Sequence, residues 1–217
     1  MINLRSQDIA NLSSTEFHIV GCGAIGSSVA TQLTRLGADN FFLYDFDKVE
    51  IQNVGVSQYV DSDVGLLKVI ALGDHMTDIN LNIRIESVAD KFEHYKGTKE
   101  GILILGLDSM SARMEIVKLL AECPTKPAFV IDGRMGAEQY QQYIYDNITV
   151  KKYEKDWYSD EDSDPEPCTR KATSYCSNMG GSFISNSIKN LVMKQPYFKE
   201  IIFNFSTLIL DKKKLIS

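Results

Sequence analysis

The sequence predicts an α/β fold in which helices cover both faces of a doubly wound, mostly parallel sheet. The first sign is a short apolar run at 17–20 that leads directly into Gly21-x-Gly23-x-x-Gly26 and then into a helical pattern. The second is an alternation of apolar strands and amphipathic helices, which favours parallel strands joined by right-handed crossovers. The third is the apolar run at 101–107, typical of a strand that is buried on both faces.

Apolar runs and amphipathic stretches give the expected order of elements. Strands are expected at 17–20, 40–45, 83–88, 101–107, 129–131, 139–145 and 201–210. Helices are expected at 24–36, 64–79, 110–122 and 169–194. This order is that of a Rossmann-like sheet followed by a C-terminal crossover loop, a helix and further strands.

Length and composition narrow the class of protein. All 217 residues, 1–217, are expected to form a single domain, and 44% hydrophobic with 24% charged residues is typical of a soluble globular chain. A net charge of −6 argues against a general nucleic-acid binder. The N-terminus lacks a signal-peptide pattern and no apolar run approaches the length of a membrane span, so we expect a cytoplasmic protein without membrane association.

The glycine loop at 21–26 predicts a phosphate site. The first glycine allows a tight turn, the second lets a phosphate approach the backbone, and the third lets the helix pack on the strand. The unpaired N–H groups and the dipole of the helix N-terminus attract an anion. Taken alone, the motif is also compatible with a plain tight turn.

Two carboxylates follow other predicted strands, at the sheet edge where ligands bind in such folds. Asp45 comes about 20 residues after the last loop glycine, where an acid can hydrogen-bond a ribose hydroxyl. Asp108 is either an N-cap acid assisted by Ser109 or a carboxylate that holds Mg²⁺ beside a triphosphate. Lys68 is either a solvated helix lysine or a phosphate ligand.

Together these motifs resemble those of the ThiF/MoeB/E1-like adenylyltransferase family. The matching residues are Gly21-x-Gly23-x-x-Gly26, Tyr44-Asp45-Phe46-Asp47-x-Val49-Glu50-x-x-Asn53, Asp63-x-Gly65-x-x-Lys68 and Asp108-x-x-x-x-Arg113. A nicotinamide-dependent oxidoreductase is not expected to share this series and is the less favoured interpretation. For Arg113, a structural salt bridge is favoured over catalysis.

The resemblance implies an enzyme that uses ATP and Mg²⁺ to activate the C-terminal carboxylate of a small ubiquitin-like or sulfur-carrier protein or of a peptide. The carboxylate would attack the α-phosphorus, and pyrophosphate would leave. Asp108 would hold the metal, and both Lys68 and Asp108 would be catalytic. Family members are usually dimers, so a homodimer is expected. The implied ATP-binding residues are Gly21, Gly23, Ala24, Ile25, Gly26, Asp45, Asp47, Asn53 and Lys68.

The chain departs from the family where an arginine is usual. The family commonly has Asn-x-x-Arg-Gln, with the arginine directed at the phosphates, whereas here Val56 occupies the arginine register and Gln58 comes one residue late. Arg134, which follows a predicted strand, is the favoured catalytic substitute, with Arg5 and Arg35 as further candidates. Without such a cation, the chain would instead be a dimeric E1-like binding or scaffold protein with weakened turnover.

Acidic residues and prolines crowd into 150–167, which is expected to be a mobile crossover loop. The run at 160–164 has some likeness to an EF-hand loop. Calcium is rejected, because Pro165 replaces the required glycine and Lys171 the final glutamate. A solvated loop and a docking strip for a basic partner tail are the two remaining interpretations.

Cys168 follows this loop in Pro167-Cys168-Thr169. The setting is similar to that of the thioester-forming cysteine in ubiquitin-activating E1 enzymes, and a helix N-terminus would favour its thiolate. The resemblance thus implies that Cys168 takes the acyl group from AMP. The alternative is an ordinary small residue at a helix start. Cys176 is expected to be a packing residue.

Overall fold

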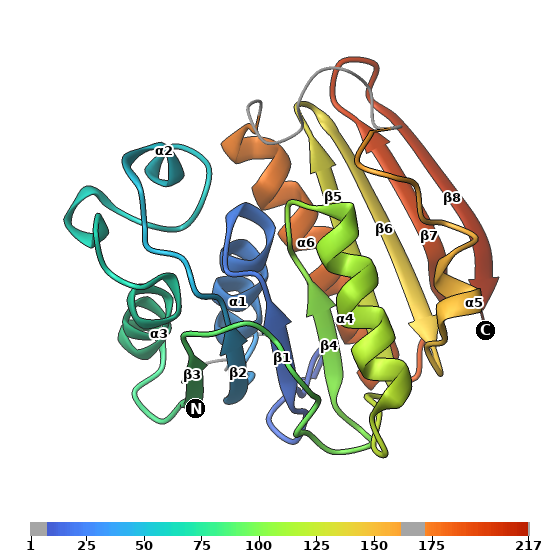
Figure 1. The fold of residues 1–217 in the computed structure, drawn as a ribbon, viewed down its shortest axis with the longest axis horizontal. Helices are drawn as coiled ribbons and strands as arrows, with labels where there is room; N and C mark the ends of the chain where they lie inside the picture. Colours follow the sequence, from blue (N-terminus) through green and yellow to red (C-terminus); the bar gives the residue numbers. More distant parts are fainter. Residues whose placement is uncertain (1–7, 162–171, 217) are drawn as a thin grey trace.

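A parallel sheet of five strands forms the centre of the fold in a computed structural model, which describes residues 8–161 and 172–216 (Figure 1). Within those residues, the sheet has the strand order β3-β2-β1-β4-β5-β6-β7-β8. The parallel strands are β3 (Arg84–Val88), β2 (Asn40–Tyr44), β1 (Phe17–Val20), β4 (Ile102–Leu105) and β5 (Phe129–Gly136). Because these strands run in the same direction, the loops that follow β1, β2 and β4 open at one edge of the sheet.

Helices cover both faces of the sheet, which confirms the doubly wound α/β fold (Figure 1). One face carries α1 (Ala24–Arg35), α3 (Lys68–Ile79) and α6 (Ser174–Val192). The other face carries α4 (Met110–Glu122) and the short α5 (Val150–Tyr153). Each layer has its own apolar cluster, with Leu33 buried on the first face and Val117 on the second. Between β2 and α3 lie the short α2 (Ile51–Val54) and a 3-10 turn, η1 (Asp61–Asp63).

The C-terminal part of the sheet differs from the prediction of one strand at 201–210. It contains an antiparallel hairpin of β7 (Tyr197–Asn204) and β8 (Ile209–Ile216), and β7 pairs with β6 (Gln139–Asp146). The turn is closed by the Asn204 side chain, whose Oδ1 accepts hydrogen bonds from the Thr207 N–H at 3.0 Å and from its Oγ1 at 3.1 Å. The apolar run of the sequence therefore crosses a turn.

Two helices begin later than the sequence suggested. The helix expected at 64–79 begins at Lys68, because η1 forms a separate turn and Gly65 follows in the left-handed region with φ +93°. The helix expected at 169–194 is α6 over the described residues, and the part of the expectation before residue 172 lies outside them. The strand expected at 129–131 extends to Gly136 as β5.

The first part of the expected mobile loop, 150–167, is structured. Residues 150–153 form α5, and residues 154–161, here called the crossover segment, are hydrogen-bonded to the body of the protein. Trp157, for example, donates from Nε1 to the Met110 carbonyl at 2.9 Å. Residues 162–167 lie outside the described part of the chain.

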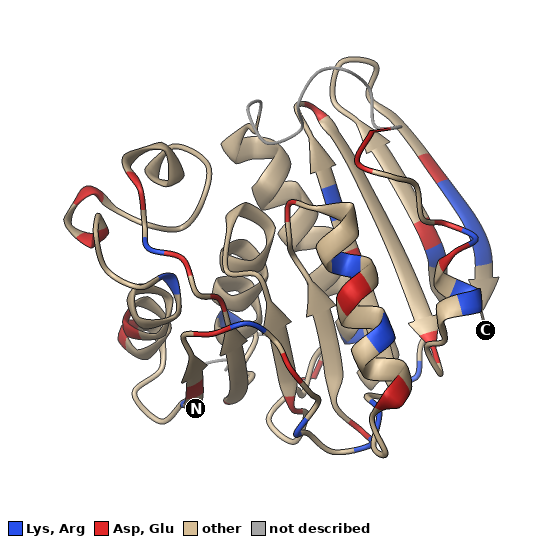
Figure 2. Cartoon of the chain, viewed as in Figure 1, with Lys and Arg blue, Asp and Glu red and all other residues tan. Residues whose placement is uncertain are grey.

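The edge strand β8 carries three consecutive lysines. Lys212, Lys213 and Lys214 follow one another along β8, and Figure 2 shows these charges gathered on that strand. Lysines on an edge strand oppose pairing with further strands, because each would have to lose hydration. Among the helices of the described residues, none combines the length and the apolar composition needed to cross a bilayer.

Close backbone packing shapes the turn between β1 and α1. Gly21 adopts φ +90°, and a Cβ there would lie 2.9 Å from the Gly106 carbonyl carbon. A Cβ on Gly26 would collide with the Gly21 carbonyl oxygen, so the first and third glycines serve the turn and the helix–strand contact. A Cβ on Gly23 would meet nothing within 4 Å.

Substitution of the last two loop glycines should therefore have very different effects on stability. Gly26→Ala should lower the free energy of unfolding by about 3 kcal/mol, because the backbone oxygen that it meets cannot move without opening the turn. Gly23→Ala is the matched control and should change it by less than about 1 kcal/mol. Urea unfolding followed by circular dichroism measures both, and equal stabilities of the two variants would contradict this account.

Candidate active site

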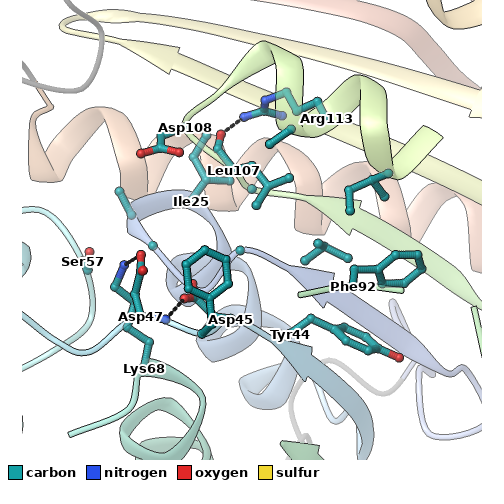
Figure 3. A pocket seen from close by; sticks show the side chains of 18 of the residues that line it. Ile25, Tyr44, Asp45, Asp47, Ser57, Lys68, Phe92, Leu107, Asp108 and Arg113 are labelled. Atoms are coloured by element: carbon teal, nitrogen blue, oxygen red, sulfur yellow. Dashed lines mark hydrogen bonds and ion pairs between the residues drawn. The ribbon is translucent and has the colours of Figure 1, made fainter. Parts of the chain in front are cut away.

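A cavity of about 390 Å³ lies where β1, β2 and β4 end (Figure 3). This volume is in the range of pockets that hold a small-molecule ligand. The cavity brings together residues from distant parts of the sequence, as the fold prediction requires. The predicted residues that line it are Gly21, Gly23, Ala24, Ile25, Asp45, Asp47, Asn53, Lys68 and Asp108. Gly26 packs beneath the loop, Arg134 is not among the lining residues, and Cys168 lies outside the described residues.

The N-terminus of α1 faces the cavity without a side-chain cap. Gly23 is the N-cap residue, and the first turn contains no acidic side chain. The first N–H groups of a helix have no intrahelical partner, so Ala24 and Ile25, which both line the cavity, can offer theirs to a ligand. Together with the open space beside Gly23, this arrangement favours an anion at this point.

Asp45 fixes the glycine loop to the chain that follows β2. Its Oδ2 accepts from the Cys22 N–H at 2.7 Å, and its Oδ1 accepts from the Asp47 N–H at 2.8 Å. Burial raises the pKa of the Asp45 carboxyl above its ordinary value, against the opposing effects of Lys68 and of the two N–H donors. The carboxylate is thus held at the cavity wall, where its remaining lone pairs can accept from a ligand hydroxyl.

Lys68 is the first residue of α3 and supplies a positive charge to the same cavity. Its Nζ contacts Asp47 Oδ2 at 2.8 Å, and its backbone N–H donates to the Asp47 carbonyl at 2.9 Å (Figure 3). Burial alone lowers the pKa of Lys68. The hydrogen bond to Asp47 and the nearby carboxylates of Asp45 and Asp108 outweigh that effect, so the pKa lies above its ordinary value. The ammonium is therefore charged and oriented by Asp47.

Two side chains that the motifs do not identify hold this arrangement together. The buried Tyr59 hydroxyl donates to the Cys22 carbonyl at 2.6 Å and lies 3.3 Å from the Lys68 carbonyl, so it joins the glycine loop to the start of α3. Phe92 and Tyr44 pack edge to face at 5.1 Å and form part of an apolar wall. The only feature of the sequence that could have pointed to Tyr59 is that it is an aromatic residue in a predicted loop.

Asn53 has a local partner that sets its orientation. Its Oδ1 accepts from the Glu50 N–H at 2.8 Å across the single turn of α2. This bond leaves the side-chain amide N–H groups available to donate, and Asn53 lines the cavity.

Asp108 follows β4 and is exposed at the cavity rim (Figure 3). Ser109 is the N-cap of α4, since its Oγ accepts from the Ala112 N–H at 3.2 Å, so the capping role does not fall to Asp108. The Asp108 carboxylate makes no hydrogen bond or ion pair with a described residue. No cluster of three or more metal-binding side chains occurs among the described residues. One free carboxylate beside an anion site fits Mg²⁺, which commonly takes its other ligands from water and phosphate.

The loop that carries Val56 is bound to α6 and supplies no cation. The Val56 carbonyl accepts from Ser177 Oγ at 2.7 Å, and Gln58 Nε2 donates to Asn178 Oδ1 at 2.9 Å. Arg35 is the last residue of α1, so it lies some 16 Å along the helix from the end that faces the cavity. Arg5 lies outside the described residues.

Arg134 does not take the place that the sequence suggested for it. Its guanidinium is almost fully buried, with Nη2 2.7 Å from Asp132 Oδ2 and Nη1 donating to the Asp156 carbonyl at 2.6 Å. Its Cζ lies 4.4 Å from the centre of the Tyr143 ring. The reason is strand geometry, because residues 132 and 134 of β5 point to the same face of the sheet. The expectation that Arg134 faces the phosphates is therefore corrected.

Arg113 shares the same buried carboxylate and forms the expected salt bridge. It contacts Asp132 and donates to the carbonyls of Leu105 at 3.2 Å and Gly133 at 2.9 Å. Burial alone would raise the pKa of Asp132, but the two guanidinium groups hold it below its ordinary value. Although Arg113 borders the cavity, its donors are engaged inside the protein.

Arg134→Met should act mainly on stability. It should lower the free energy of unfolding by about 3 kcal/mol, because removing one partner leaves the buried Asp132 charge poorly compensated. Lys213→Met breaks the exposed ion pair with Glu200 and should leave stability nearly unchanged. Chemical denaturation measures both variants. If the Arg134 variant kept wild-type stability but bound the ligand less well, Arg134 would act on the ligand and this structural role would be wrong.

Comparison with solved structures shows the same fold. Escherichia coli MccB, solved with ATP, aligns with a TM-score of 0.73 at 15% identity, over 96% of this chain and 65% of that chain. PaaA aligns with a TM-score of 0.71 at 18% identity, over 94% of this chain and 64% of that chain.

Comparison of sequences finds relatives of greater length. Ubiquitin-like modifier-activating enzyme 5 of Dictyostelium discoideum is 36% identical over 126 residues, which is 51% of this chain and 32% of the relative. The enzyme of the same name from Caenorhabditis elegans is 34% identical over 113 residues, 45% of this chain and 27% of the relative. The match thus spans about a third of these relatives or less. A family model described as the ThiF family matches residues 2–211, and the chain therefore belongs to the ThiF family.

Proposed function

We propose that this chain binds ATP in the cavity and uses it to adenylate the C-terminal carboxylate of a small ubiquitin-like or sulfur-carrier protein or of a peptide. The observation that carries the proposal is the meeting of an uncapped helix N-terminus, Lys68 and Asp108 around one cavity. The names of the relatives support it, since they include ubiquitin-like modifier-activating enzymes and an MccB solved with ATP. A homodimer in the cytoplasm is part of the same proposal.

Each side chain has a separate task in this proposal. The N-terminus of α1 and Lys68 bind the phosphates, Asp45 accepts from the ribose, and the wall that includes Phe92 contacts the base. Asp108 would hold Mg²⁺, which would supply positive charge to the phosphates. Asp47 orients Lys68 through their ion pair, and Asn53 donates from its free amide.

The reaction is an in-line displacement at the α-phosphorus. An oxygen of the partner carboxylate forms a bond to phosphorus, the bond to the pyrophosphate oxygen breaks, and pyrophosphate leaves with the electron pair. The chain holds the two reactants in line and neutralises charge with Lys68 and the α1 N–H groups, which is how such transfers are accelerated.

A binding or scaffold role without efficient turnover is the second candidate. The small number of cations at the cavity favours it. The basic residues among the described lining are Lys68, Lys91 and Arg113. Arg113 is committed to Asp132, and Val56 stands where the family has an arginine. An oxidoreductase is disfavoured, because hydride transfer has no use for a lysine and an exposed carboxylate, Lys68 and Asp108, at the same cavity.

Pyrophosphate exchange separates the first two candidates. With Mg·ATP and a set of candidate partner proteins and peptides, wild type should exchange labelled pyrophosphate into ATP. Asp108→Ala should reduce the rate about a hundredfold or more, because charge on the phosphates is no longer neutralised. Asp78→Asn, an exposed acid at the far end of α3, is the control. ATP binding without exchange for any partner would favour the scaffold.

Thioester formation at Cys168 is a separate part of the proposal. In this step the thiolate attacks the acyl carbon and AMP leaves with the electron pair. Cys168 lies outside the described residues, four positions before Ala172, which lines the cavity. Two other thiols are poor candidates, because burial raises the pKa of Cys176 to about 11 and that of Cys22 well above its ordinary value.

Cys168→Ala should abolish a thiol-reducible adduct with the partner while leaving pyrophosphate exchange intact. Non-reducing electrophoresis after incubation with Mg·ATP and partner measures the adduct, and Cys123→Ala is the matched control. An adduct that survives Cys168→Ala would end the thioester hypothesis without affecting the adenylation step.

A further inference from the structure

The N-terminus of α4 is occupied by a carboxylate from the crossover segment. Asp160 Oδ1 accepts from the Met110 N–H at 2.6 Å, and its Oδ2 accepts from the Ser111 N–H at 3.0 Å. The same Oδ2 lies 3.2 Å from Ser109 Oγ. The N–H donors hold the pKa of the Asp160 carboxyl below its ordinary value, although burial alone would raise it. Three donors thus converge on one acid that lies 50 residues beyond the helix start.

The crossover segment has two further anchors, so this contact belongs to a built interface. Trp157 Nε1 donates to the Met110 carbonyl at 2.9 Å and its ring joins the apolar cluster of that face. Asp156 accepts from Arg134 through its carbonyl and from the Tyr145 hydroxyl at 3.0 Å through Oδ2. The segment is therefore bound to β5, β6 and α4.

These contacts surround the peptide that carries Asp108. On its N-terminal side, the Leu107 carbonyl accepts from Arg113 (Figure 3). On its C-terminal side, Ser109 and Met110 are bound by Asp160. The main chain is held on both sides of Asp108, while the Asp108 side chain stays unbonded among the described residues.

The occupied helix end also explains why Asp108 makes no capping contact among the described residues. A helix N-terminus attracts a nearby carboxylate, and an acid just before the first turn is well placed to cap it. With Asp160 in that position, the donors of α4 are already satisfied. Asp108 is left to face the cavity, and the uncapped α1 end is left for an anion.

We propose that Asp160 is a positioning residue for Asp108: it binds the start of α4 and so keeps the Asp108 carboxylate directed at the metal that accompanies ATP. The inference rests on the proposed function, because it concerns the same metal and nucleotide. Loss of Asp160 should weaken the affinity for the Mg²⁺ that accompanies ATP before it affects the fold.

The test is equilibrium binding of ATP at increasing Mg²⁺ concentration, in the full chain without any partner protein. Asp160→Ala should raise the Mg²⁺ concentration for half-maximal binding roughly fivefold, the size expected for a lost cap. Asp160→Asn should give a smaller rise, since an amide keeps one acceptor but presents a donor to the other N–H. Glu161→Ala is the matched control, because Glu161 is exposed and adjacent.

Trp157 gives a second readout that needs no nucleotide. It is the chain's single tryptophan, so acrylamide quenching of its fluorescence reports whether the crossover segment stays bound to α4. Quenching should increase in both Asp160 variants and stay at the wild-type level in Glu161→Ala. Circular dichroism checks that the variants are folded.

The outcomes separate this inference from the proposed function. An unchanged Mg²⁺ dependence in both Asp160 variants, against a wild type that binds Mg·ATP, would overturn the positioning role alone. Failure of wild type itself to bind Mg·ATP would overturn the proposed function and this inference together. An equal rise in Glu161→Ala would reduce the effect to general loss of negative charge, and would also overturn the positioning role.

Discussion

The buried carboxylate of Asp132 is the interaction on which the second half of the structure depends. A charge that is fully buried is costly unless partners compensate for it, and here Arg113 from α4 and Arg134 from its own strand do so. Tyr153 of α5 adds a hydrogen bond at 2.9 Å. One acid therefore joins β5, α4 and α5, and the guanidinium groups extend its reach to the carbonyls of β4 and of the crossover segment.

The two helix N-termini beside the cavity, those of α1 and α4, are built differently. At α1, the N-cap is a glycine that makes no side-chain capping bond among the described residues, so backbone N–H groups are available to a ligand. At α4, Ser109 and Asp160 satisfy the donors completely. Helix ends of the same kind thus differ: the first offers its N–H groups to the cavity, whereas those of the second are bonded to Ser109 and Asp160.

The sequence predicts the parts of the site that depend on local motifs. The glycine loop, Asp45 and Asp108 were placed at one sheet edge because strand direction and loop order determine that edge. The pairing of Arg134 with Asp132 was also readable in principle, since alternate residues of a strand share a face. It was missed because the strand was expected to end at residue 131.

The sequence alone does not predict polar contacts between residues that lie far apart in the chain. Asp160 lies in an acidic run in which no residue stands out, and only the fold brings it to a helix that begins 50 residues earlier. Tyr59 joins two loops through carbonyl groups, which every residue possesses, so no motif marks its partners. The hairpin of β7 and β8 was hidden because apolar residues continue through its turn.

The net charge of the cavity affects how well it can bind a nucleotide. Its described lining holds five carboxylates against three cations, a net charge of −2. The carboxylates are Asp45, Asp47, Asp90, Asp108 and Glu115. A triphosphate would meet repulsion at such a surface, unless added cations compensate for it. The arginine that the family resemblance leads us to expect at this register would supply part of that compensation. Under the proposed function, Val56 at this register should make nucleotide affinity and turnover depend more steeply on bound metal, and therefore on the orientation of Asp108.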